Sequence, residues 1–310
     1  MSSTCCPNDA EEAKRQVAEY AMSLGFSAVG FARVDDVDAD SADNFDRWIA
    51  ERRNGTMEYL ERYADIRRNP SLLLDGARTV IVAALNYYPA RRRSPDLPQF
   101  AFYAYGRDYH EVMRERLASL GDYVREHFGG STRACVDTAP IRERYWAVKA
   151  GVGFVGKNST LIIPGKGSFF FIGELLTTVE FPPDEPCALH CGACSRCVDA
   201  CPGRAIVDGC RIDARRCLSY LTIEHRGPLP DDVMLGNHVY GCDECQLVCP
   251  HNLKAEPTAI PEFVPTEAFL ALDREAILAM TPADFSEIFR HSAVKRAKLD
   301  GLQRNAKRIN

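Results

Sequence analysis

The spacing of the cysteines constrains this chain more than any other feature of its sequence. Ten of the 13 cysteines lie between Cys187 and Cys249. The run Cys191-x2-Cys194-x2-Cys197-x3-Cys201-Pro202 has the spacing of bacterial iron–sulfur ferredoxins. Turns of two residues let three thiolates bind one cluster, and the longer step before Cys201 directs the fourth thiolate to a neighbouring cluster. The region therefore predicts a domain organised by metal clusters.

A second, shorter array, Cys242-x2-Cys245-x3-Cys249-Pro250, repeats the end of the first, and Cys217 is the candidate for its missing cysteine. Because the last cysteine of each array ligates the other cluster, we expect two sets of ligands. One [4Fe-4S] cluster would be bound by Cys191, Cys194, Cys197 and Cys249, and the other by Cys201, Cys217, Cys242 and Cys245. A pair of zinc sites is the alternative, although the Cys-Pro steps have no role in a tetrahedral zinc site. The remaining cysteines, Cys5, Cys6, Cys135, Cys187 and Cys210, are predicted to be ordinary thiols.

Strands and helices alternate before the cysteine-rich region. The patterns predict helices at 9–25, 45–53, 57–66, 108–128 and 141–150, and strands at 26–31, 79–85, 133–137, 161–163 and 169–179. This alternation is typical of a layered α/β domain. We therefore expect a sheet domain over 1–181, a ferredoxin-like domain with two clusters over 182–256, and a short helical segment over 257–310.

Composition adds limits on compartment and partners. No apolar run approaches the ~20 residues of a membrane-spanning helix, and the first residues do not resemble a secretory leader. We expect a cytoplasmic protein without membrane contact, whose cysteines stay reduced. The net charge is −5, so binding to nucleic acid would need a local basic patch. Residues 290–310 carry seven basic side chains and one acidic side chain, which fits either a solvated helix face or a phosphate-binding surface.

A glycine-rich segment, Gly151-Val-Gly-Phe-Val-Gly-Lys-Asn158, matches the GxGxxG pattern of nucleotide-binding loops. Such loops require the order strand, loop, helix, whereas the expected order here is helix, loop, strand. Nucleotide binding is therefore disfavoured. A loop that lets the backbone approach another flat cofactor, or a plain turn, remains open.

Asp137 is the candidate catalytic carboxylate. It follows a predicted strand and precedes a helix, where open α/β sheets bind ligands. Capping of the helix is the structural alternative. In a closed apolar site, burial would raise the pKa of Asp137 and keep it protonated, as a general acid requires. His110, in the aromatic segment 103–110, is predicted to be a hydrogen-bonded structural residue.

Taken together, the chain resembles epoxyqueuosine reductases, the family that completes queuosine formation in bacterial tRNA. The similarity covers residues 10–255 in unbroken order. It rests on both cysteine arrays and on Ala84-Leu-Asn-Tyr-Tyr-Pro89, Val136-Asp-Thr-Ala-Pro140 with Glu143-Arg144, Ala150–Asn158, Gly173-Glu174 and Tyr240–Gln246.

The resemblance implies an oxidoreductase that binds cobalamin beside two [4Fe-4S] clusters. Its reaction would reduce an epoxide to an alkene on the wobble base of the tRNAs for Asp, Asn, His and Tyr, with electrons from an external donor. Asp137 would donate the proton, and Arg226 is a candidate tRNA contact. The residues that match positions around the corrin are Arg67, Asp137, Lys157, Asn158, Leu161, Ile172 and Asp243.

Two other functions remain open, and two further expectations follow from the resemblance. A reductive dehalogenase would use similar cofactors, although those proteins normally carry a twin-arginine leader. A ferredoxin-like electron carrier would use the clusters alone. We expect a monomer. Many relatives continue into C-terminal helical repeats, so the basic segment before Asn310 would bear more of the tRNA binding.

Overall fold

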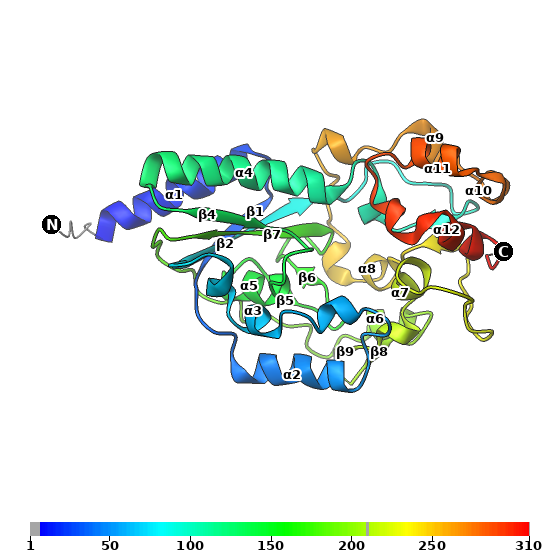
Figure 1. The fold of residues 1–310 in the computed structure, drawn as a ribbon, viewed down its shortest axis with the longest axis horizontal. Helices are drawn as coiled ribbons and strands as arrows, with labels where there is room; N and C mark the ends of the chain where they lie inside the picture. Colours follow the sequence, from blue (N-terminus) through cyan, green and yellow to red (C-terminus); the bar gives the residue numbers. More distant parts are fainter. Residues whose placement is uncertain (1–6, 209–210, 310) are drawn as a thin grey trace.

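The computed structural model describes residues 7–208 and 211–309. Cys5, Cys6 and Cys210, predicted to be ordinary thiols, lie outside the described residues. The chain forms a layered sheet domain at one end, while the cysteine-rich segment and the C-terminal helices lie at the other end (Figure 1). No helix in the described part of the chain is long and apolar enough to span a membrane.

A four-stranded sheet is the centre of the first part. Its strands follow the order β1 (Ala28–Arg33), β2 (Thr79–Asn86), β7 (Phe170–Thr177) and β4 (Thr132–Cys135). The expected α/β class is confirmed, and every pair in this sheet is antiparallel. The sequence argument placed a ligand site at Asp137 by a rule that holds for the carboxyl ends of parallel strands. That rule does not apply to this antiparallel sheet, so the argument was wrong.

Helices cover both faces of this sheet, which explains the continuous apolar sequence of β2. Its odd-numbered residues Ile81, Ala83 and Leu85 pack against α1 (Pro7–Ser23) and α4 (Tyr109–Phe128). Its even-numbered residues Val80, Val82 and Ala84 pack on the other side, against the helix α5. That side of the sheet carries α2 (Ala39–Ala50), α3 (Ala64–Arg68), α5 (Glu143–Lys149) and the hairpin of β5 (Phe154–Val155) and β6 (Leu161–Ile162) (Figure 1).

The long helix α4 matches its predicted bounds closely, and the reason lies at its two ends. Asp108 is the N-cap residue, and its carboxylate accepts a hydrogen bond from the backbone amide of His110. Gly129 follows the helix with φ of 74°, a backbone conformation that glycine adopts without strain. The helix therefore places His110 in its first turn, at the end of the sheet domain nearest the cysteine-rich segment (Figure 1).

The cysteine-rich segment contains only short elements. They are α6 (Arg196–Ala200), β8 (Ile206–Val207), β9 (Arg211–Ile212), the 3-10 helix η4 (Ala214–Arg216), α7 (Leu218–Ile223), β10 (His238–Tyr240), α8 (Glu244–Leu247) and the 3-10 helix η5 (Pro250–Asn252). Strand β10 pairs in parallel with β3 (Gln99–Phe100), which fixes the segment to the sheet domain.

The C-terminal part is helical, as expected. It comprises η6 (Pro261–Phe263), α9 (Glu267–Ala271), α10 (Arg274–Ala279), α11 (Pro282–Ile288), η7 (Ala293–Ala297) and α12 (Lys298–Ala306). One buried core joins all three parts, since it includes Met113, Leu221 and Phe289. The boundaries after residues 181 and 256 stay predictions.

Candidate active site and cluster-binding site

The structure gathers the first predicted set of cysteines around one cavity. Cys191, Cys194 and Cys197 come from the loop before α6 and its first turn, and Cys249 joins them from the end of α8. The rest of the lining is Lys157, Asn158, Ile162, Pro250 and His251. Thiols on different sides of an enclosed space suit a cubane cluster, whose corners lie apart.

The second predicted set is also close in space. Burial raises the pKa of the Cys245 thiol to about 12, and the neighbouring Cys217, Cys201 and Cys197 contribute. Burial and the nearby Cys217 and Cys245 raise the pKa of Cys242 as well. Several half-buried thiols that share one region cannot all ionise unless positive charge is supplied, and an iron–sulfur cluster supplies it. The donor set therefore fits a second cluster.

The two sets adjoin each other, because Cys197 of the first contributes to the pKa shift of Cys245 in the second. The cysteines of the described part are free thiols, so they are available as ligands. Two cysteines outside the sets differ in setting. Cys135 is buried on β4, where burial raises its pKa to about 12. Cys187 packs beside the first set. Within residues 7–208 and 211–309, no three His, Cys, Asp or Glu side chains are grouped to hold a single metal ion.

Asp137 lies in the loop between β4 and α5, in a strained backbone conformation. Its φ is 36°, in the left-handed region that L residues rarely adopt. Its backbone amide donates a 2.7 Å hydrogen bond to Oε1 of Glu143. Helix α5 begins after Arg142, which has no side-chain capping bond, so Asp137 is not the cap of this helix. The carboxylate is left to interact with other groups.

His110 is the partner of that carboxylate. The distance from His110 Nε2 to Asp137 Oδ2 is 3.0 Å, and that from His110 Nδ1 to Asp108 Oδ1 is 2.7 Å. Burial alone would lower the pKa of His110, but the two carboxylates raise it to about 9. Burial alone would raise the pKa of Asp137, but the hydrogen bond and charge of His110 hold it below its usual value. The condition for a protonated Asp137, a closed apolar site, is therefore not met, because His110 supplies a cation.

Aromatic side chains wall the space that Asp137 faces. The charge of Asp137 acts on both Tyr103 and Tyr109, and all three side chains keep exposed surface; we call the partly exposed surface that they share the recess. Tyr103 donates a 3.0 Å hydrogen bond to the hydroxyl of Tyr240, two residues before Cys242. The recess therefore lies where the sheet domain meets the second set of cysteines.

Two acids, the half-buried Glu143 and the buried Glu174, lie behind Asp137. Burial and the nearby Asp137 raise the pKa of Glu143 to about 7. Glu174 on β7 is fully buried, and neither of its carboxyl oxygens has a hydrogen-bond partner among the described residues. Its pKa is raised well above the usual range by burial, and then by Glu143 and Asp137. Glu174 thus keeps its neutral form to a pH well above the usual titration range of a carboxyl.

The residues predicted to surround a corrin lie in three places: at the recess, in the loop that touches the cysteines, and at buried positions. Arg67 faces the recess, since Tyr59, Asp137 and Glu143 all act on its charge. Lys157 Nζ donates to the Cys194 carbonyl at 2.8 Å, and Asn158 Nδ2 donates to the Cys245 carbonyl at 3.4 Å, so this loop touches both sets of cysteines.

The other three of these residues are also buried. Leu161 and Ile172 belong to the core on the α5 side of the sheet. Asp243 is buried and accepts a 2.6 Å hydrogen bond from the backbone amide of Phe102, and burial raises its pKa to about 6. Asp243 thus fixes the second set of cysteines to the aromatic wall.

The glycine-rich loop follows α5 and precedes β5, the order that disfavours nucleotide binding. A Cβ atom on Gly153 would lie 2.3 Å from the carbonyl oxygen of Ile162. Glycine is therefore needed for the close approach of β5 to β6. This hairpin carries Ile162 to the cavity of the first set of cysteines.

Comparison with known proteins decides the family. The model for epoxyqueuosine reductase QueG, DUF1730, matches residues 67–138, and the model for a 4Fe-4S double cluster binding domain matches residues 190–252. An epoxyqueuosine reductase of Cellulophaga algicola is 37% identical over 301 residues, which cover 96% of this chain and 98% of that protein. The chain belongs to the epoxyqueuosine reductase family. It is an oxidoreductase of the type that uses two [4Fe-4S] clusters and cobalamin.

Two solved epoxyqueuosine reductases have the same fold as this family member. One, solved with an epoxyqueuosine-modified tRNA-Tyr stem loop, matches with a TM-score of 0.85 at 34% identity, over 96% of this chain and 80% of that chain. Another, from Bacillus subtilis, matches with the same TM-score at 33% identity, over 96% of this chain and 80% of that chain. Its catalytic aspartate loop is swung out of the active site. Family membership argues against zinc as the metal bound by the cysteine arrays. It also favours neither a reductive dehalogenase nor a ferredoxin-like electron carrier.

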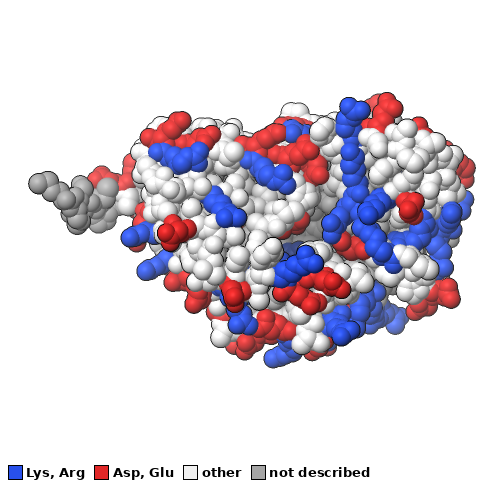
Figure 2. All heavy atoms as spheres, in the orientation of Figure 1, with Lys and Arg blue, Asp and Glu red and all other residues white. Residues whose placement is uncertain are grey.

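The basic C-terminal segment is partly used inside the protein. Arg226 donates to the carbonyls of Ile223 and Arg296, and Arg304 donates to the carbonyls of Leu221, His225 and Gly227. Figure 2 shows Lys and Arg side chains gathered on the half of the molecule that carries α7 and α12. Several of these arginines therefore join the C-terminal helices to the cysteine-rich segment.

Sequence reasoning missed the roles of His110, Glu143 and Glu174. Glu174 carried a usable signal, because it is a charged residue within the apolar run Phe170–Thr177. A carboxyl inside a buried strand is either neutral or paired, and both cases point to a site. The contact of His110 with Asp137 carried no such signal, since 27 residues separate them.

Proposed function

We propose that this chain reduces epoxyqueuosine in tRNA, converting the epoxide to an alkene with loss of water. The observation that supports this most strongly is the position of Asp137, whose charge acts on Tyr103, the residue that donates a hydrogen bond to Tyr240 beside the second set of cysteines. Electron-transfer groups and a proton donor are both needed for a reductive loss of oxygen. A relative of the same fold was solved with an epoxyqueuosine-modified tRNA stem loop.

In this proposal Asp137 is the catalytic acid, and its proton goes to the epoxide oxygen as the carbon–oxygen bond breaks. Cys191, Cys194, Cys197 and Cys249 bind one cluster, and Cys201, Cys217, Cys242 and Cys245 bind the other. The first set is supported by its common cavity, and the second by the charge effects that its half-buried thiols have on one another.

Bound cobalamin supplies reducing chemistry that no amino-acid side chain can supply. Arg67, Asp137, Lys157, Asn158, Leu161, Ile172 and Asp243 are proposed as the residues around it. Arg67 is supported by its position at the recess, and Lys157 and Asn158 by their contacts with both sets of cysteines. Leu161 and Ile172 form the apolar floor on that side, and Asp243 orients the loop of Cys242.

The substrates would be the tRNAs for Asp, Asn, His and Tyr, bound in the cytoplasm by a monomer, with the wobble base in the recess. Arg226 is proposed as a phosphate contact. It lies beside Arg296, whose guanidinium stacks over the ring of Tyr59 with 5.5 Å to the ring centroid. Tyr59 in turn responds to the charge of Asp137, so this basic group borders the recess. An external electron donor would reduce the clusters.

The decisive experiment is anaerobic reconstitution of the full chain with iron, sulfide and cobalamin, followed by reaction with an epoxyqueuosine-containing anticodon stem loop and a chemical reductant. Mass spectrometry of the released nucleosides should reveal the loss of one oxygen atom. Asp137→Asn should load both cofactors and leave the epoxide intact. If a fully loaded wild-type chain left the epoxide unchanged, the proposed function would be wrong, and the role of an electron carrier would be favoured.

A further inference from the structure

Asp108, His110 and Asp137 form a continuous chain of hydrogen-bonding groups that ends in the recess. His110 lies between the two carboxylates, at 2.7 Å from Asp108 and 3.0 Å from Asp137. The side chains of Asp108 and His110 are 25% and 21% exposed, whereas that of Asp137 is 52% exposed. The chain therefore leads from a sheltered carboxylate to an accessible one.

The imidazole of His110 is held in place from several directions. Its backbone amide donates to Asp108 Oδ1 at 3.0 Å, in the N-capping bond of α4. Its ring stacks on that of Tyr109 with 4.0 Å between the ring centroids, and the ring of Tyr109 stacks on that of Phe171 with 4.3 Å between the centroids. A ring fixed in this way keeps its two nitrogens directed at two separate carboxylates.

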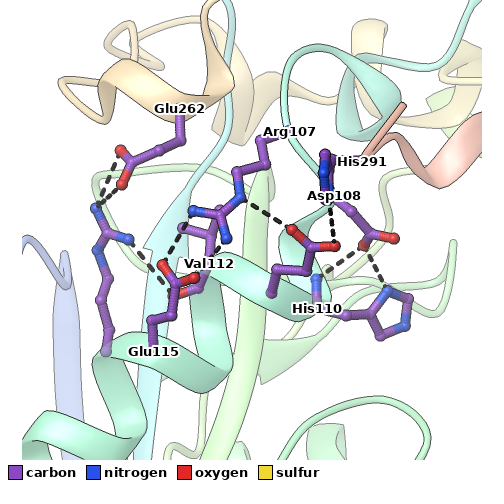
Figure 3. Close-up of polar contacts among 9 residues, drawn as sticks. Arg107, Asp108, His110, Val112, Glu115, Glu262 and His291 are labelled. Carbon is purple, nitrogen blue, oxygen red and sulfur yellow. Dashed lines mark hydrogen bonds and ion pairs between the residues drawn. The ribbon is translucent and has the colours of Figure 1, made fainter. Parts of the chain in front are cut away.

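The neighbouring cation does not compete for Asp108. Figure 3 shows the Arg107 guanidinium directed to Glu115, while the Asp108 carboxylate is directed to the amide and ring of His110. Arg107 also donates to Glu111. Among the described residues, His110 is the ion-pair partner found for Asp108. The charge of Asp108 thus acts mainly on the imidazole.

The charged groups around His110 come from three elements. Asp108 belongs to the start of α4, Asp137 to the β4–α5 loop, and Glu143 and Arg144 to α5. Tyr103 from η3 (Phe102–Ala104) completes the wall and has a raised pKa, so it is neutral. The guanidinium of Arg114 acts on Asp108, and those of Arg67 and Arg144 act on Asp137 and Glu143, but only the carboxylates of Asp108 and Asp137 hydrogen bond to the ring among the described residues. An imidazolium is therefore favoured up to about pH 9, and Asp137 is ionised at rest.

An ionised Asp137 cannot protonate an epoxide until it receives a proton itself. We propose that His110, oriented by Asp108, is the proton store that supplies Asp137 during each turnover. His110 is thus a positioning and proton-supplying residue that acts through Asp137. This inference rests on the proposed function.

The balance of the reaction requires such a supply. Reduction of an epoxide to an alkene and water consumes two electrons and two protons, and the external reductant provides the electrons. For each proton, the N–H bond at His110 Nε2 breaks and an O–H bond forms at Asp137 Oδ2, 3.0 Å away. The new O–H bond then breaks as the departing oxygen gains the proton. Neutral His110 regains a proton from water, so the first proton opens the epoxide and the second releases water.

The test compares His110→Gln and Asp108→Asn with His127→Gln. His127 is a matched control, because it lies on the last turn of α4 and its ring contacts the carbonyl of Tyr123. We expect His110→Gln to lower kcat by about 10²-fold, in the range of general acid–base catalysis, with KM and cofactor loading unchanged. The wild-type rate should fall above about pH 9, this alkaline limb should disappear in His110→Gln, and it should shift to lower pH in Asp108→Asn. His127→Gln should match the wild type.

A second readout needs no turnover. The reconstituted chain is labelled with 15N-histidine, and the imidazole NMR signal of His110 is identified by its absence from His110→Gln. This signal should titrate near pH 9, and Asp137→Asn should lower the pKa that it reports. Titration near 6.5, or a His110→Gln enzyme with the wild-type alkaline limb, would overturn the proposal. If the wild type reduces the epoxide and only these results fail, the proposed function stands. If the wild type is inactive, both the proposed function and this inference are contradicted.

Discussion

The backbone amide of Asp137 donates a 2.7 Å hydrogen bond to Oε1 of Glu143 across the β4–α5 loop. The bond supports a left-handed backbone conformation that costs an L residue roughly 1–3 kcal/mol. Glu143 therefore keeps the carboxylate of Asp137 in the recess. Glu143→Ala should let the loop relax and lower kcat by about tenfold, since small displacements of catalytic groups cost rate. Steady-state kinetics at fixed cofactor loading would measure this.

Glu143→Gln is the control for that prediction. Its amide oxygen can still accept the bond from Asp137, so the variant should keep most of the activity. Hydrogen exchange of residues 137–142 should rise in Glu143→Ala and stay near the wild-type level in Glu143→Gln. Equal losses of activity in the two variants would mean that the charge of Glu143, and not its hydrogen bond, matters.

The division of the cysteines predicts which cluster each variant loses. Cys249→Ser should lose the cluster of Cys191, Cys194 and Cys197, although Cys249 lies in the second array of the sequence. Cys242→Ser should lose the other cluster. Each variant should hold about half the iron of the wild type, and reduced samples should lose the spin coupling between two clusters in electron paramagnetic resonance.

Cys187→Ser is the control for the cluster assignment. Cys187 packs beside the first set of cysteines but does not line its cavity. Its loss should leave the iron content unchanged. A drop in iron for Cys187→Ser would show that this thiol replaces one of the assigned ligands.

Glu174 makes the stability of the protein depend on pH. Its pKa is raised by folding, so the folded state binds a proton that the unfolded state releases above about pH 4.3. The stabilising effect of that proton is complete below this pH and is lost as the pH rises toward the folded pKa. The free energy of unfolding should therefore fall by about 1.4 kcal/mol per pH unit from this group.

Glu174→Gln removes this dependence, because the amide has nearly the same shape and no charge. Urea unfolding of the loaded protein at pH 5 to 8 should give a flatter profile for Glu174→Gln, with greater stability than the wild type at pH 8. Glu180→Gln is the matched control, since Glu180 is a surface residue paired with Arg78. Parallel profiles for the wild type and Glu174→Gln would contradict a neutral Glu174 in the fold.

Much of the fold was predictable because local patterns dominate it. The β2 strand and the α4 helix appear within a residue or two of their predicted bounds, since a continuous apolar run and an Asp cap with a final glycine define them. The grouping of Cys191, Cys194, Cys197 and Cys249 around one cavity followed from their spacing, because a cluster fixes the spacing of its ligands. The short elements between Trp48 and Leu73 were less accurate, and the helix expected at 57–66 became η1 (Glu58–Leu60) and α3.

The chemistry at Asp137 could not be read from the sequence in the same way. Burial was expected to raise the pKa of Asp137, and it does act in that direction. The deciding group is His110, which the antiparallel sheet and the start of α4 bring within 3.0 Å. Such a contact depends on tertiary packing and leaves no periodic pattern. A pKa is therefore the least predictable property of a site, because neighbours distant in sequence set its sign.

Arg226 should contribute to tRNA affinity through phosphate contact. Arg226→Gln should weaken binding of the anticodon stem loop and lower the slope of log Kd against log salt by about one. Arg78→Gln is the control, because Arg78 is a surface arginine that pairs with Glu180 near the far end of β7. Binding measured by fluorescence anisotropy at several salt concentrations would compare them. An unchanged slope with a lowered melting temperature would assign Arg226 a structural role only, through its bonds to Ile223 and Arg296.

Arg93 joins the C-terminal helices to the sheet domain from inside the protein. It is 4% exposed and donates to the carbonyls of Pro98, Phe269 and Leu272. Its guanidinium also lies over the rings of Phe100 and Phe269, at 5.2 and 5.4 Å from their centroids. Arg93→Met would keep much of the side-chain volume but leave three carbonyls without their donor. Since each buried unpaired group costs about 1–3 kcal/mol, the variant should lose at least 3 kcal/mol of stability.

The neighbouring Arg92→Met isolates the effect of these buried bonds. Arg92 is exposed and stacks on Tyr88 with 4.8 Å to the ring centroid, so its loss should cost less than about 1 kcal/mol. Urea unfolding of the loaded chains would give both values, and limited proteolysis should cut residues 257–297 faster in Arg93→Met than in Arg92→Met. Equal stabilities would mean that water replaces the guanidinium at Phe269 and Leu272, and that the C-terminal helices are held by their apolar contacts alone.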